Sequence, residues 1–169
     1  MNKAIRSLIL LIPLIFFQQS CGIYKLNGAS IPEGMNTFNV EIFENSAPIV
    51  VPYLSQELTE SLKERIRSQS RLNQVSNGEA DAAFEGRITG YSIAPAAVGG
   101  QNDMAQANRL TISVNVKYVD NINPDNSFEQ TFTRFKDFRD AIQSQEQQLI
   151  RDINLMLTED IFNRAFANW

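Results

Sequence analysis

The sequence predicts an α+β fold, a two-layer sandwich in which two helices pack on one face of a four- to five-stranded mixed sheet. Two observations support this prediction. Several segments alternate apolar and polar side chains with the two-residue period of a half-buried strand, and two longer segments repeat apolar side chains at helical spacing. Because each strand has a single apolar face, we expect the helices to cover that face and to leave the other open.

The strand pattern is clearest in residues 109–119, where Leu, Ile, Val and Tyr alternate with Arg, Thr, Ser, Asn and Lys. The same alternation occurs less completely in residues 38–42, 82–93 and 127–136, and residues 72–75 are a short strand candidate. In residues 82–93 the alternation places Tyr91 on the polar face. Gly86 and Gly90 in that strand indicate a bulge or the close approach of another backbone.

Two segments are predicted to be helical. Residues 55–69 begin at Ser55, a favourable N-cap, and carry an apolar stripe at every fourth position, made of Leu54, Leu58, Leu62 and Ile66. Residues 143–167 carry a wider stripe, made of Leu149, Ile150, Ile153, Met156, Leu157 and Ile161 and broadened by Phe162 and Phe166. A stripe of that width is typical of a helix that packs against more than one surface. The predicted order is therefore β-α-(β)-β-β-β-α.

The N-terminal segment has the layout of a bacterial secretion signal. Lys3 and Arg6 precede an apolar run over residues 8–17, which is too short to remain as a membrane-spanning helix of about 20 residues. Small Ser20 then precedes Cys21, which is the single cysteine of the chain. This arrangement predicts that the signal ends at a cysteine that accepts lipid.

The sequence accordingly divides into a lipoprotein signal peptide over residues 1–20, an acylated N-terminus and tether over residues 21–35, and one domain over residues 36–169. Gln18 stands three places before the cysteine, where the usual lipid-acceptor motif has an aliphatic residue. An ordinary signal peptide followed by an unmodified cysteine is the alternative. An odd cysteine in an exported protein needs an explanation, and acylation supplies one.

Composition argues against several function classes. Of the 15 Lys plus Arg, cleavage removes Lys3 and Arg6 and leaves 13 against 19 Asp plus Glu, a net charge of −6, so nucleic acid is not an expected partner. The chain has no histidine, which removes the commonest general base and a common metal ligand. Because no phosphate-binding loop is present either, we expect no enzymatic activity, no metal and no cofactor apart from the covalent lipid on Cys21.

Three basic residues of the predicted strands are candidates for binding. Arg87, Arg109 and Lys117 occupy the polar faces of their strands, so adjacent strands would gather them into a basic patch. Guanidinium and ammonium groups suit phosphate. The alternative, which we favour slightly, is that they pair across the strands with carboxylates such as Glu85 and Glu129.

Seven short motifs, spread over nearly the whole mature chain, carry a resemblance to a known family: residues 21–24 (CGIY), 45–48 (NSAP), 54–56 (LSQ), 84–91 (FEGRITGY), 108–116 (NRLTISVNV), 128–132 (FEQTF) and 157–166 (LTEDIFNRAF). Each motif is short, and their common order gives the resemblance its specificity. On these residues the chain resembles the lipopolysaccharide-assembly lipoproteins of the LptE family.

The resemblance implies a non-enzymatic outer-membrane lipoprotein. Proteins of this family sit inside the lumen of the LptD barrel, help it to assemble and assist the delivery of lipopolysaccharide to the outer leaflet. The implied partners are an LptD-type barrel, lipopolysaccharide, and the membrane through the lipid anchor, with the domain facing the periplasm and the barrel lumen. Arg87, Arg109 and Lys117 are candidate lipopolysaccharide contacts by their chemistry, and no binding residue of the family is transferred to them.

One other class of protein combines a lipid anchor with a small α+β domain. Auxiliary lipoproteins of lipid-transport ABC systems have this organisation, but their partner lies in the inner membrane or the periplasm. Membrane fractionation separates the two hypotheses. Gly22 follows the cysteine, and no acidic residue that would favour inner-membrane retention stands beside it, so the outer membrane is the expected location.

Overall fold

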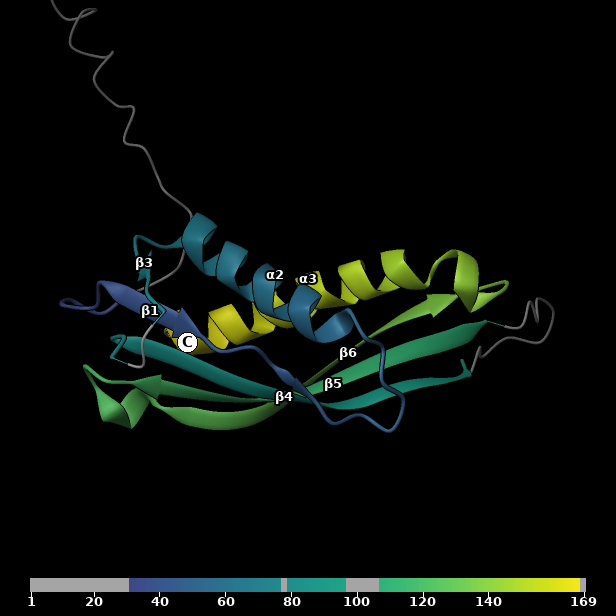
Figure 1. The fold of residues 1–169 in the computed structure, drawn as a ribbon, viewed down its shortest axis with the longest axis horizontal. Coiled ribbons are helices and arrows are strands. Elements are labelled where there is room, and N and C mark those ends of the chain that lie inside the picture. Colours follow the sequence, from purple (N-terminus) through teal and green to yellow (C-terminus); the bar gives the residue numbers. More distant parts are fainter. Residues whose placement is uncertain (1–30, 77–78, 97–106, 168–169) are drawn as a thin grey trace, which may run out of the picture.

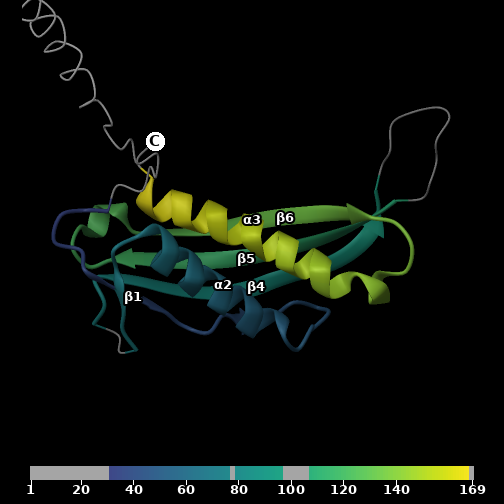
Figure 2. The ribbon, with the colours of Figure 1, turned by 90° about the horizontal axis from the view of Figure 1, so that it is seen from above.

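The computed structural model describes residues 31–76, 79–96 and 107–167 and confirms the α+β class. Two helices lie on one face of a mixed sheet, and the opposite face is left without a covering layer (Figure 1, Figure 2). The expected signal peptide, Cys21 and most of the expected tether fall outside the described residues. Among those residues, neither helix is both long and apolar enough to span a membrane.

The sheet has a long antiparallel part and a short parallel part. β4 (Ala82–Pro95), β5 (Asn108–Asp120) and β6 (Phe128–Phe138) form the antiparallel ladder. β1 (Thr37–Val40) pairs in parallel with β4 and with β3 (Asn73–Gln74) at the edge. The order of the main path is β3-β1-β4-β5-β6, with the two-residue β2 (Glu44–Asn45) paired to β4 beyond β1.

The two helices bury the predicted stripes, except that Met156 is only partly buried. α2 (Leu54–Gln69) buries Leu54, Leu58, Leu62 and Ile66, and α3 (Glu146–Phe166) buries Leu149, Ile150, Ile153, Leu157, Ile161, Phe162 and Phe166. α2 packs beside β1, β2 and β3, and α3 packs over β5 and β6. Both stripes join the inner side chains of β4 and β5 in one apolar layer. Phe166 joins this layer at the end of α3, where its ring lies 6.0 Å from that of Phe84 and 5.9 Å from that of Tyr118.

One predicted N-cap is wrong, and α3 begins at Glu146, three residues after its predicted start. α2 begins at Leu54 with Tyr53 in the N-cap position, and the Ser55 hydroxyl does not cap the helix. It donates a hydrogen bond to the backbone carbonyl of Phe43 instead. The sequence pattern could not show this, because the acceptor belongs to the segment beside β2 and not to the helix.

The two glycines of β4 act in the two ways that the sequence left open. A Cβ on Gly86 would lie 2.7 Å from the Phe43 ring, so the close approach is made by a side chain. The register with β5 shifts between Ile88 and Gly90, which makes a β-bulge.

The bulge overturns the predicted orientation of Tyr91. Because one extra residue inverts the alternation that follows, Tyr91 pairs with Ile112 and is buried, where the uninterrupted pattern would have placed it on the polar face. Its hydroxyl donates a 2.6 Å hydrogen bond to Glu146 on α3. Burial, together with the Glu146 carboxylate, raises the pKa of the Tyr91 phenol.

The contact between Gly86 and Phe43 makes a testable prediction about stability. Gly86→Ala forces the Phe43 ring out of a filled core, and overpacking of this kind costs about 1–3 kcal/mol in the free energy of unfolding. Gly90→Ala is the matched control, because its Cβ would approach Ser113 only to 3.3 Å. Urea unfolding of both variants measures the difference, and an equal loss in the two would contradict the packing at Gly86.

Candidate functional site

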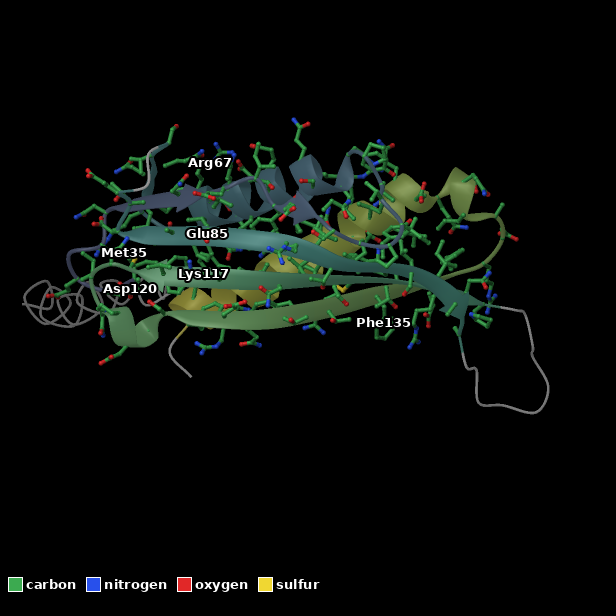
Figure 3. The ribbon with its side chains drawn as sticks, turned by 60° about the horizontal axis from the view of Figure 1, so that its bottom comes forward. Met35, Arg67, Glu85, Lys117, Asp120 and Phe135 are labelled. Atoms are coloured by element: carbon green, nitrogen blue, oxygen red, sulfur yellow. The ribbon has the colours of Figure 1, made fainter. Side chains whose placement is uncertain are left out.

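The open face of the sheet, formed by the outward side chains of β4, β5 and β6, is the candidate site. Its centre is a strip of hydroxyl and amide groups. Ser113 and Thr133 share a 2.9 Å hydrogen bond, and the Asn115 amide donates to the Thr131 hydroxyl at 3.5 Å. Because the helices occupy the other face, this strip meets solvent. Figure 3 shows the molecule with the open face of the sheet turned forward. The strip can form many weak polar contacts.

One end of the open face is a charged hollow of about 290 Å³. The Lys117 ammonium on β5 lies 3.2 Å from Glu85 on β4, and the two are neighbours in Figure 3. The Arg87 guanidinium lies 3.2 Å from Glu44 on β2. Glu41 and Glu129 also line the hollow, with Ile42, Gly86 and Asn115. Four carboxylates against two cations make this end acidic.

The other end of the open face is built around Arg109. Its guanidinium makes a two-pronged ion pair with Asp137 on β6, at 2.6 and 2.9 Å, and stacks 3.7 Å from the centre of the Phe135 ring. The hydrogen bonds from Arg109 lower the pKa of the Asp137 carboxyl, and those same bonds raise the pKa of Arg109. Phe135 remains 47% exposed, so an aromatic surface stands at this end.

The structure brings two of the three predicted basic residues together. Arg87 pairs in register with Asn115 on β5, and Lys117 is two positions from Asn115. Arg109 is six positions from Asn115 in the other direction, roughly 20 Å away at 3.4 Å per residue. The three therefore do not form one patch. Cross-strand pairing is confirmed for Lys117 with Glu85. Contact of Arg87, Arg109 and Lys117 with lipopolysaccharide stays a prediction, as does acylation of Cys21, which lies outside the described residues.

Two ion pairs that the sequence did not reveal hold α3 over β6. Arg134 binds Asp160 through two hydrogen bonds of 2.5 and 2.6 Å, and Lys136 lies 3.2 Å from Asp152. The signal was present in the alternation, because Arg134 falls on the same side of its strand as Phe132 and so points to the helices. The alternation could not show how close that strand lies to α3, so the two ion pairs could not be predicted.

The described residues contain no group of three or more Cys, Asp or Glu side chains placed to hold a metal ion. The chemistry that the open face offers is hydrogen bonding, ion pairing and stacking on Phe135. These contacts suit the recognition of another polar surface.

Comparison with known proteins gives a family match. The model of the family LptE, described as lipopolysaccharide-assembly, matches residues 35–165, which include every strand of the described domain, all of α2, and all of α3 except its last residue. None of the curated proteins compared with the chain matches it.

Solved structures show the same fold at low sequence identity. A minor lipoprotein from Acinetobacter baumannii has a TM-score of 0.50 and 15% identity, over 76% of this chain and 91% of that one. The hypothetical protein CT253 from Chlamydia trachomatis has a TM-score of 0.56 and 9% identity, over 79% and 99%. Protein XCC0632 from Xanthomonas campestris has a TM-score of 0.54 and 8% identity, over 79% and 87%. At these identities the likeness concerns the fold alone.

The ion pair of Arg109 makes a prediction about pH. Since the folded pKa of Asp137 is depressed, the pair stabilises the fold above the unfolded pKa of about 3.9, and this contribution is lost as the pH falls through the folded pKa. We expect Arg109→Gln to return the carboxyl pKa of Asp137 toward its ordinary value in an NMR titration, while Arg87→Gln leaves it unchanged. An unaltered titration in Arg109→Gln would show that the pair does not form in solution.

Proposed function

We propose that this chain, which belongs to the LptE family of lipopolysaccharide-assembly proteins, is an outer-membrane lipoprotein that plugs an LptD-type barrel. In this role it assists assembly of the barrel and supports the transport of lipopolysaccharide to the outer leaflet. The family role is non-enzymatic. The proposal places the domain in the barrel lumen on the periplasmic side, held by lipid on Cys21.

The open face of the sheet is the observation that best supports the plug. Large membrane barrels have a polar, water-filled lumen, so a protein that fills one must present polar surface to its wall. The hydroxyl strip centred on Ser113 and Thr133 has this character, and it lies on a rigid three-stranded ladder. A polar contact of this kind can keep its hydrogen bonds through trapped water, so docking costs little hydrogen-bond energy.

The charged ends of the open face can exchange partners during transport. Arg87 and Lys117 are 60% and 51% exposed, and exposed ion pairs contribute only about 0–1 kcal/mol each. A phosphate group of lipopolysaccharide could therefore replace a carboxylate at little cost, although the surrounding acids oppose its approach. We retain Arg87 and Lys117 as proposed contacts on this ground. Arg109 is retained for the affinity of its guanidinium for phosphate, although its two-pronged pair with Asp137 is exchanged less readily.

The plug makes a prediction about partnership. Affinity-tagged full-length protein, extracted from membranes in mild detergent, should co-purify with an outer-membrane barrel, and depletion of the protein should lower barrel levels and surface lipopolysaccharide. Mass spectrometry and surface labelling measure these outcomes. Unchanged barrel and lipopolysaccharide levels would refute the plug, and co-fractionation with the inner membrane would favour the auxiliary lipoprotein of an ABC system.

The proposed contacts make a separate prediction. The double variant Arg87→Glu and Arg109→Glu should bind lipopolysaccharide several-fold more weakly, because two cations become anions while both side chains remain at the surface. Arg67→Glu is the matched control, since Arg67 pairs with Glu64 on the solvent side of α2, 47% exposed. Binding to purified lipopolysaccharide and a thermal melt of each variant measure the effect. Unchanged binding would leave the carboxylate pairs as the whole role of these residues.

A further inference from the structure

The connection between β2 and α2 exposes two adjacent aliphatic side chains. Residues 46–52 read SAPIVVP, an apolar sequence for a surface loop. Ala47 and Val51 are 5% and 7% exposed and pack into the core, whereas Ile49 and Val50 between them are 53% and 61% exposed. Single exposed aliphatic residues are ordinary on a protein surface, but two neighbours at one loop tip form a small apolar protrusion.

This loop is held in shape at its base. The Asn45 side chain accepts a hydrogen bond from the Ala47 N–H at 3.2 Å and donates one to the Val51 carbonyl at 3.4 Å, so it joins the two ends of the loop. The Ser46 N–H donates to the Ile88 carbonyl of β4 at 2.9 Å. Because the base is already ordered, docking of the tip would cost less conformational entropy than docking of a free loop.

The charge around the loop indicates which kind of surface the tip contacts. Residues 41–62 contain the four acids Glu41, Glu44, Glu57 and Glu60 and neither Lys nor Arg. Glu44 pairs with Arg87 and Glu60 with Lys63, so the net negative charge of this part of the described domain comes from Glu41 and Glu57. Anionic lipid headgroups would be repelled by this segment, and basic groups around an apolar recess would be attracted to it. The charges therefore favour a protein surface over an anionic membrane surface.

The position of the loop indicates the same partner as the open face. In Figure 1 the blue chain between β1 and α2 runs down beside β4 to the level of the sheet before it turns up into α2. Seen from above, this chain lies outside the edge of the sheet at β4 (Figure 2). A protein that covers the open face would therefore meet the loop at the edge of the same contact.

We propose that the loop tip formed by Pro48, Ile49 and Val50 is a docking element that inserts into an apolar recess, rimmed by basic groups, on the barrel partner. This inference rests on the proposed function, because it names how that partner is held. The open face supplies broad polar contact, and the tip supplies apolar surface whose removal from water on docking adds to the binding free energy.

The test compares two sets of exposed aliphatic residues in the full acylated protein. Ile49→Ser with Val50→Ser should weaken binding to the purified barrel partner at least tenfold, which corresponds to about 1.4 kcal/mol. Ile122→Ser is the matched control, since Ile122 is 45% exposed in the β5–β6 connection, and its binding should equal that of the wild type. Circular dichroism and thermal melts of each variant show whether the fold is retained.

The outcomes separate this inference from the proposed function. If the wild type binds the barrel and the double variant binds equally well, the docking element is refuted while the plug stands. If the wild type binds no barrel, the plug itself is refuted.

A fluorescence measurement distinguishes protein from lipid. The emission of a tryptophan introduced by Val50→Trp, corrected for native Trp169, should shift to the blue when the barrel is added. It should not shift with phosphatidylglycerol vesicles. A shift with vesicles alone would overturn the proposed recess in favour of a lipid contact.

Discussion

The arrangement of the whole domain depends on a sheet that has one apolar face. The inner side chains of β4 and β5, among them Phe84, Ile88, Val114 and Val116, are buried almost completely, and they supply one side of the only apolar layer in the described domain. Burial at about 25 cal/mol per Å² makes this layer the main source of stability. Both helices must therefore lie on the same side. The polar outer face remains free for contact with another molecule as a consequence of that constraint.

Periodicity predicted most of this arrangement and failed where the decisive contact was remote in sequence. The alternation in residues 109–119 and the stripes on both helices follow from local patterns, so the fold class and the faces were predictable. The inverted face at Tyr91 depends on the bulge, and Gly90 indicated a bulge without fixing which residue is extra. Pairing of Arg87 with Glu44 depends on β2, whose two residues are too short to give any periodic signal.

The electrostatics of the open face are more local than a count of basic residues suggests. Each of the three candidate cations lies against a carboxylate, two at the acidic hollow and Arg109 at the far end of the strip. The surface is therefore polar, and each of these cations already has a carboxylate partner on it. Such a surface suits a contact made over a wide area. Membership in the lipopolysaccharide-assembly family gives this surface its context, and the solved structures add that the same fold occurs in a minor lipoprotein from Acinetobacter baumannii.

In the proposed complex the open face of the sheet lies closer to the partner than the helical face does. Single cysteines introduced by Thr131→Cys on β6 and Ser68→Cys on α2 test it directly, since both positions are exposed in the free domain. Maleimide labelling is compared with and without the barrel partner. The partner should protect the position on β6 and leave the position on α2 reactive. Equal labelling of both positions in the complex, or protection of α2 alone, would contradict it.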